Sequence, residues 1–74
     1  MNLRLYTIYL FNNKDECYDN EFGTPTNLLK YIDEEPNRFR SDIIYDLDGP
    51  GGVSLECFAK KQDIIQRLKQ LNKL

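Results

Sequence analysis

The chain contains no histidine and only two cysteines among its 74 residues, and this scarcity limits the chemistry open to it. Histidine is the commonest general base, metal ligand and pH switch in proteins. Cys17 and Cys57 therefore have no imidazole to activate them as nucleophiles. We expect a protein without enzymatic activity and without a bound cofactor or metal ion.

Long apolar runs are also missing. The N-terminal apolar stretch, residues 5–11, is too short to cross a membrane and lacks the cleavage site of a signal peptide. Two cysteines are too few for a disulfide framework of the secreted type, so we predict two reduced, half-buried thiols, with a disulfide as the alternative. The net charge of −2 is too small to recruit nucleic acid or an anionic membrane. We expect a cytoplasmic protein that does not bind membranes.

Two segments partly match known binding motifs, but neither fits its motif. Asp46, Asp48 and Glu56 are spaced somewhat like ligands of a calcium loop, but Pro50 replaces a ligand and the glutamate comes one residue early. The glycine-rich segment 49–52 leads into a predicted strand, whereas a phosphate loop leads into a helix N-terminus. We interpret this segment as a hairpin turn.

What the chain does contain is a gap-free internal similarity at an offset of 36 residues, obtained by laying residues 7–35 over 43–71. An apolar pattern that recurs in register indicates a duplicated supersecondary unit. The length allows one domain, 1–74, which we divide into units 3–35 and 41–72 with a linker at 36–40. The matched positions are Ile8/Ile44, Tyr9/Tyr45, Phe11/Leu47, Cys17/Val53, Phe22/Phe58, Leu28/Ile64, Leu29/Ile65 and Ile32/Leu68.

The sequence pattern of each unit predicts a strand, a turn, a second strand and a helix. In the second unit, residues 42–47 and 53–57 alternate with period two, and a helical apolar stripe follows over 60–72. In the first unit the strands are 3–11 and 16–22, and Thr24-Pro25 begins a helix that Pro36 ends.

We therefore predict a two-layer α/β (α+β) fold of order ββαββα, with an antiparallel-rich sheet and both helices on one face. If residues 16–22 are not a strand, the alternative is βαββα. The residues expected to be largely buried are Leu5, Leu28, Ile32, Leu55, Ile64 and Leu68.

The offset also assigns the faces of the sheet. Because Ile43, Tyr45 and Leu47 form one apolar face, the matching positions of the first strand, Leu3, Leu5, Thr7, Tyr9 and Phe11, are expected in the core. The opposite face then carries an exposed strip, which antiparallel sheets seldom show and which resembles a contact surface. Tyrosine and arginine are typical of binding hot spots. The predicted partner-binding residues are Arg4, Tyr6, Ile8, Leu10, Tyr18 and Ile44.

These features favour a small protein-binding module, an adaptor or inhibitor that docks its open sheet face on itself as a homodimer or on another protein. The alternative is a nucleic-acid-associated protein that uses the basic C-terminal helix, which has a local excess of four positive charges. Those charges are spread around the helix without interleaved aromatics, so nucleic acid is the less favoured partner. We also expect the acidic end of the first helix, residues 33–35, to lie beside the basic start of the second, residues 60–61.

Overall fold

The computed structural model describes residues 4–73 and confirms the predicted ββαββα order. A short 3₁₀ turn, η1 (Pro50–Gly52), joins the third and fourth strands. The segment predicted as the second strand is a strand, so the βαββα alternative is not what the chain adopts. The elements are β1 (Tyr6–Phe11), β2 (Cys17–Gly23), α1 (Pro25–Glu34), β3 (Ile44–Asp48), β4 (Ser54–Ala59) and α2 (Lys61–Leu71).

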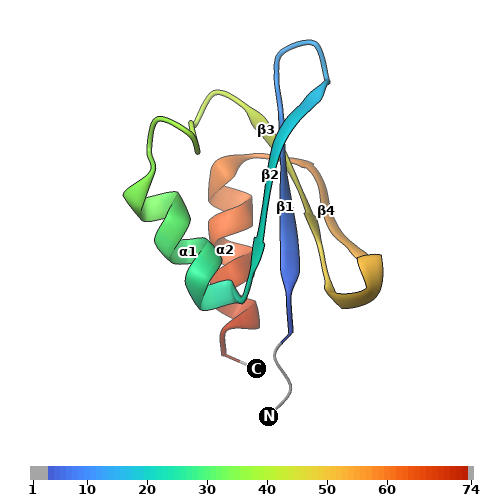
Figure 1. Ribbon diagram of the computed structural model, residues 1–74, viewed down its shortest axis with the longest axis vertical. Helices are drawn as coiled ribbons and strands as arrows, with labels where there is room; N and C mark the ends of the chain where they lie inside the picture. Colours follow the sequence, from blue (N-terminus) through green and yellow to red (C-terminus); the bar gives the residue numbers. More distant parts are fainter. Residues whose placement is uncertain (1–3, 74) are drawn as a thin grey trace.

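The four strands form one sheet in the order β2-β1-β3-β4, and every neighbouring pair is antiparallel. Both helices lie on the same side of this sheet, and no described helix covers its other side (Figure 1). The architecture is a two-layer α+β fold in which one layer is the sheet and the other is the helix pair. Each half of the chain supplies one strand–strand–helix unit, while the duplication inferred from the offset stays a hypothesis.

The helices begin where the sequence predicts. The Thr24 hydroxyl accepts the Asn27 N–H at 3.3 Å, and Pro25 occupies the first turn, where its missing N–H costs no hydrogen bond. At the start of α2 the Asp63 carboxylate accepts the Lys60 N–H at 3.3 Å. The Thr26 hydroxyl donates to Oδ1 of Asn72 at 2.8 Å, which joins the start of α1 to the end of α2. The two helices are therefore antiparallel, as Figure 1 shows.

The core lies between the sheet and the helix pair. Four of the six residues predicted to be buried are buried, and Leu55 is half-buried against them. The prediction is wrong for Leu5, which is 48% exposed because it precedes β1. Leu3 lies outside the described residues. The buried apolar residues are Tyr6, Ile8, Leu10, Leu28, Ile32, Phe39, Tyr45, Leu47, Ala59, Ile64 and Leu68.

The face assignment of the first strand is also wrong. Tyr6, Ile8 and Leu10 point into the core, whereas Thr7, Tyr9 and Phe11 point to the side without helices. The reason is that the two hairpins differ in length. Tyr6 pairs with Gly23, 17 positions later, but Tyr45 pairs with Ala59, only 14 positions later. The difference of three is odd, and an odd shift exchanges the two faces of a strand.

Candidate protein-docking surface

The uncovered side of the sheet, here called the open face, carries aromatic side chains from three strands. Register places Phe22 opposite Thr7 and Ile44 opposite Phe11, so these residues share a face with Tyr9. Phe22 and Phe58 are each 62% exposed and Ile44 is 37% exposed. Antiparallel sheets with one solvated side normally place polar residues there. The apolar members of the open face are Tyr9, Phe11, Phe22, Ile44 and Phe58.

Phe58 is held on this face by an unusual backbone conformation. Its φ is +49°, a left-handed value that is rare for a bulky residue. The register of β3 with β4 shifts between Tyr45 and Leu47, and this irregularity surrounds Phe58. Its N–H donates to Oδ1 of Asp46 at 2.8 Å, and its ring centroid lies 5.9 Å from that of Phe11. Strained residues of this kind cluster at functional sites.

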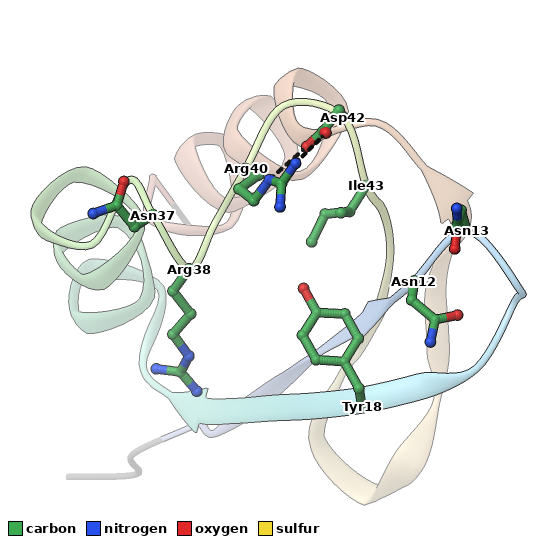
Figure 2. Close-up of a pocket in the computed structure, with 8 residues that line it drawn as sticks. All are labelled: Asn12, Asn13, Tyr18, Asn37, Arg38, Arg40, Asp42 and Ile43. Carbon is green, nitrogen blue, oxygen red and sulfur yellow. Dashed lines mark hydrogen bonds and ion pairs between the residues drawn. The ribbon is translucent and has the colours of Figure 1, made fainter.

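The structure does not bring the six predicted contact residues together. Tyr6, Ile8 and Leu10 are buried between sheet and helices, so their predicted exposure is wrong. Arg4 is exposed but precedes β1. Tyr18 is 52% exposed and points into a hollow beside the loop after α1 (Figure 2). Only Ile44 lies on the open face.

Sequence reasoning missed Tyr9, Phe11, Phe22 and Phe58 as members of this surface. A signal for the correct face was present, because Thr7 is the least apolar residue between Tyr6 and Phe11 and is a poor core residue. Phe22 gave a second signal, because it follows the polar residues Asn20 and Glu21 in its strand. The exposure of Phe58 could not be foreseen, because it depends on a local bulge.

Arg38 supports the edge of the sheet. It follows α1 and reaches β2, where its Nε lies 2.7 Å from Oδ2 of Asp19 and its Nη1 lies 2.8 Å from Oε1 of Glu21. The hydrogen bond from Arg38 holds the pKa of Asp19 below its ordinary 3.8, against a smaller opposing effect of burial. Asp19 and Glu21 in turn raise the pKa of Arg38. The cluster fixes the loop after α1 against the outer strand.

A hollow of about 480 Å³ lies between this loop and the β1–β2 turn. Figure 2 shows the residues that line it. Its cationic groups are already engaged, because Arg38 binds Asp19 and Glu21 while Arg40 binds Asp42. Oδ1 of Asn12 accepts the N–H groups of Lys14 and Glu16, so this amide stabilises its own turn. Both arginines of the hollow are therefore already neutralised, and the remaining polar lining groups, Asn13, Tyr18 and Asn37, carry no positive charge for an anionic ligand.

A second groove, of about 550 Å³, runs between α1 and α2 on the outside of the helix layer. Leu29 and Ile65 form its apolar floor, and Asp33 and Lys61 both line it. The acidic end of α1 thus lies beside the basic start of α2, as predicted. The groove has charges of both signs and lacks the aromatic side chains of the open face, so the open face is the better candidate for docking.

Comparison with protein-family models, with curated proteins and with solved structures finds no significant match to this chain. Within residues 4–73, no group of three histidine, cysteine, aspartate or glutamate side chains is placed to hold a metal ion. Cys17 and Cys57 are free thiols and are exposed, not half-buried as predicted. None of the helices described here is long and apolar enough to cross a bilayer.

Proposed function

We propose that this protein is a small non-enzymatic binding module that docks another protein on its open face. The observation that carries the proposal is the group of exposed aromatic side chains on an uncovered sheet, with Phe58 held there at φ +49°. Covering exposed apolar surface is favourable by roughly 25 cal/mol per Å². A strained residue that displays an aromatic ring to water indicates selection for contact over stability. Both thiols are free, which supports a reducing compartment such as the cytoplasm.

The test compares two variants that each remove an exposed apolar side chain, from different places. Phe58→Asn removes the ring and introduces asparagine, a residue type that tolerates positive φ. Val53→Ser is the matched control, because Val53 is 60% exposed but lies in the turn before β4. Each protein, immobilised on a resin, is exposed to lysate of its native cell, and retained proteins are quantified by mass spectrometry. We expect a partner retained by the wild type and by Val53→Ser but lost from Phe58→Asn. Equal retention by all three would reject the open face as the docking surface.

The alternative of nucleic-acid association through α2 is supported by its charge. Lys61, Arg67 and Lys69 give this helix an excess of positive charge over Asp63. One of these groups is already engaged, since Nε of Arg67 lies 3.3 Å from Oε2 of Glu56. Phosphate binding weakens steeply with salt, whereas apolar docking does not. A salt titration of any complex separates the two functions.

A further inference from the structure

The charge of the open face indicates what kind of partner it fits. Resting on the proposed function, we propose that the open face binds a basic protein segment whose arginine or lysine side chains lie over the aromatic rings and reach Asp46 and Asp48. A second copy of this chain is not the partner.

The two outer strands, β2 and β4, are poor docking elements, so we place the partner on the open face and not along an edge of the sheet. A sheet can bind an extended peptide along a free edge, through unpaired backbone groups. Here Nη2 of Arg38 donates to the Asn20 carbonyl of β2 at 2.9 Å, and Nη2 of Arg67 donates to the Leu55 carbonyl of β4 at 3.2 Å. The register of β4 also shifts twice along β3, which breaks the regular edge. A strand added at either edge would have to displace an arginine.

The open face carries negative charge, and no residue within 4–73 forms an ion pair with its carboxylates. Asp46 lies opposite Tyr9, and Asp48 lies opposite Thr7, so both carboxylates border the aromatic group. Both are half-buried already, and Asp46 keeps its bond to the Phe58 N–H. Among the positions that the register of the described strands places on this face, none is basic. Covering unpaired carboxylates with an apolar surface is costly, so a complementary partner brings cations.

Two other occupants fit less well. Face-to-face contact of two copies would bring the carboxylates of both into one interface without any positive group, and like charges there are unfavourable. Exposed aromatics can stack nucleic-acid bases, but single-strand binding also requires a positive groove along the backbone. A basic side chain satisfies both features of the surface, because arginine and lysine are attracted to aromatic faces as well as to carboxylates.

The test uses two synthetic peptides with the same central Leu-Leu pair, one flanked by arginines and the other by glutamates. Each is titrated into the isotopically labelled protein, and backbone amide shifts locate and quantify binding by NMR. We expect the arginine peptide to bind at least about tenfold more tightly, with shifts at Tyr9, Phe11 and Phe58. Asp48→Asn should reduce this preference severalfold, whereas Val53→Ser should leave it unchanged.

The outcomes separate this inference from the proposed function. Equal affinity for the two peptides, or preference for the glutamate peptide, would overturn the basic partner. If Phe58→Asn then weakens the binding of both peptides, docking on the open face is still supported. Shifts from neither peptide at the open face would overturn the basic partner, whereas docking on the face is rejected by equal retention of partners on the wild type and both variants. An oligothymidylate is titrated in the same way. If it binds more tightly than the arginine peptide, both proposals are overturned in favour of nucleic-acid binding. Concentration-dependent self-association through the same amides at low salt would reject the exclusion of a second copy.

Discussion

Phe58 combines two unfavourable features, a left-handed backbone and a ring exposed to water over 62% of its surface. Asparagine tolerates this backbone better than phenylalanine does. We therefore expect Phe58→Asn to leave the free energy of unfolding unchanged or to raise it by up to about 1 kcal/mol, because relieved strain offsets the lost contact with Phe11. Urea denaturation measures this. A loss above about 2 kcal/mol would mean that Phe58 holds the fold together and is not kept for contact.

Leu68 and Leu5 are both leucines predicted to be buried, but the structure separates them. Leu68 is fully buried under the sheet, whereas Leu5 is 48% exposed. Leu68→Ala should lower the free energy of unfolding by about 2–5 kcal/mol, since it leaves a cavity. Leu5→Ala should change it by less than about 0.5 kcal/mol. Chemical denaturation of the two variants checks this, and equal losses would contradict the placement of Leu5.

The contact between Arg38 and Asp19 makes stability depend on pH. Because the pKa of Asp19 is lower in the folded protein than its ordinary 3.8, its contribution is complete above that pH and is lost as the pH falls through the folded value. Arg38→Met should cost about 1 kcal/mol at neutral pH, given the partly exposed pair. It should also flatten the decline in stability below pH 3.8.

Unfolding followed by circular dichroism from neutral to acidic pH checks this, with Arg40→Met as the control. Arg40 and Asp42 are paired but both side chains are more than half exposed. Arg40 also lowers the pKa of Asp42, but the pair is exposed, so the control should change the profile less than Arg38→Met does. An Arg38→Met profile parallel to that of the wild type would show that the pH dependence has another origin.

Among the elements, α1 and α2 each carry charges that oppose their own macrodipoles. Asp33 lies near the end of α1 and Lys61 begins α2, positions that favour the opposite signs. The antiparallel arrangement brings both to one groove, where they can compensate each other. A double-mutant cycle with Asp33→Asn and Lys61→Gln should give a favourable coupling of about 0.2–1 kcal/mol that disappears at high salt. No coupling at low salt would mean that the two helix ends are electrostatically independent.

The β1–β2 and β3–β4 hairpins show why the offset of 36 residues that matches the two helices does not match the faces of the strands. Under the offset of 36, Pro25 corresponds to Lys61 and both buried helix pairs match, Leu28 with Ile64 and Ile32 with Leu68. A helix surface tolerates a small angular error, because the buried stripe is broad. A strand has a period of two, so one displaced residue exchanges inside for outside.

For the whole molecule, the acidic open face predicts a monomer. The wild type should sediment with a mass near 8.8 kDa at low salt, because the carboxylates of two facing copies repel. High salt screens this repulsion and strengthens apolar contact, so weak dimerisation should appear there. Analytical ultracentrifugation across a salt series checks both. A stable dimer at low salt would contradict the charge argument.

The elements and their order followed from local signals. Alternation predicted the strands, Thr24-Pro25 and Pro36 bounded the first helix, and the glycines after Asp48 predicted the turn. These signals depend on neighbours along the chain, so one sequence suffices to detect them. The buried stripe of each helix followed for the same reason.

Which face of the sheet meets the helices depended on pairings between distant residues. The bulges in β2 and β4 set the register, and register decided that Ile8 is core while Phe11 and Phe58 meet solvent. A bulge depends on how the strand, its turn and the packing of its side chains fit together, so no local sequence pattern predicts it. The existence of an apolar open face was therefore predictable from composition and alternation, but its residues became known only once the strands were paired.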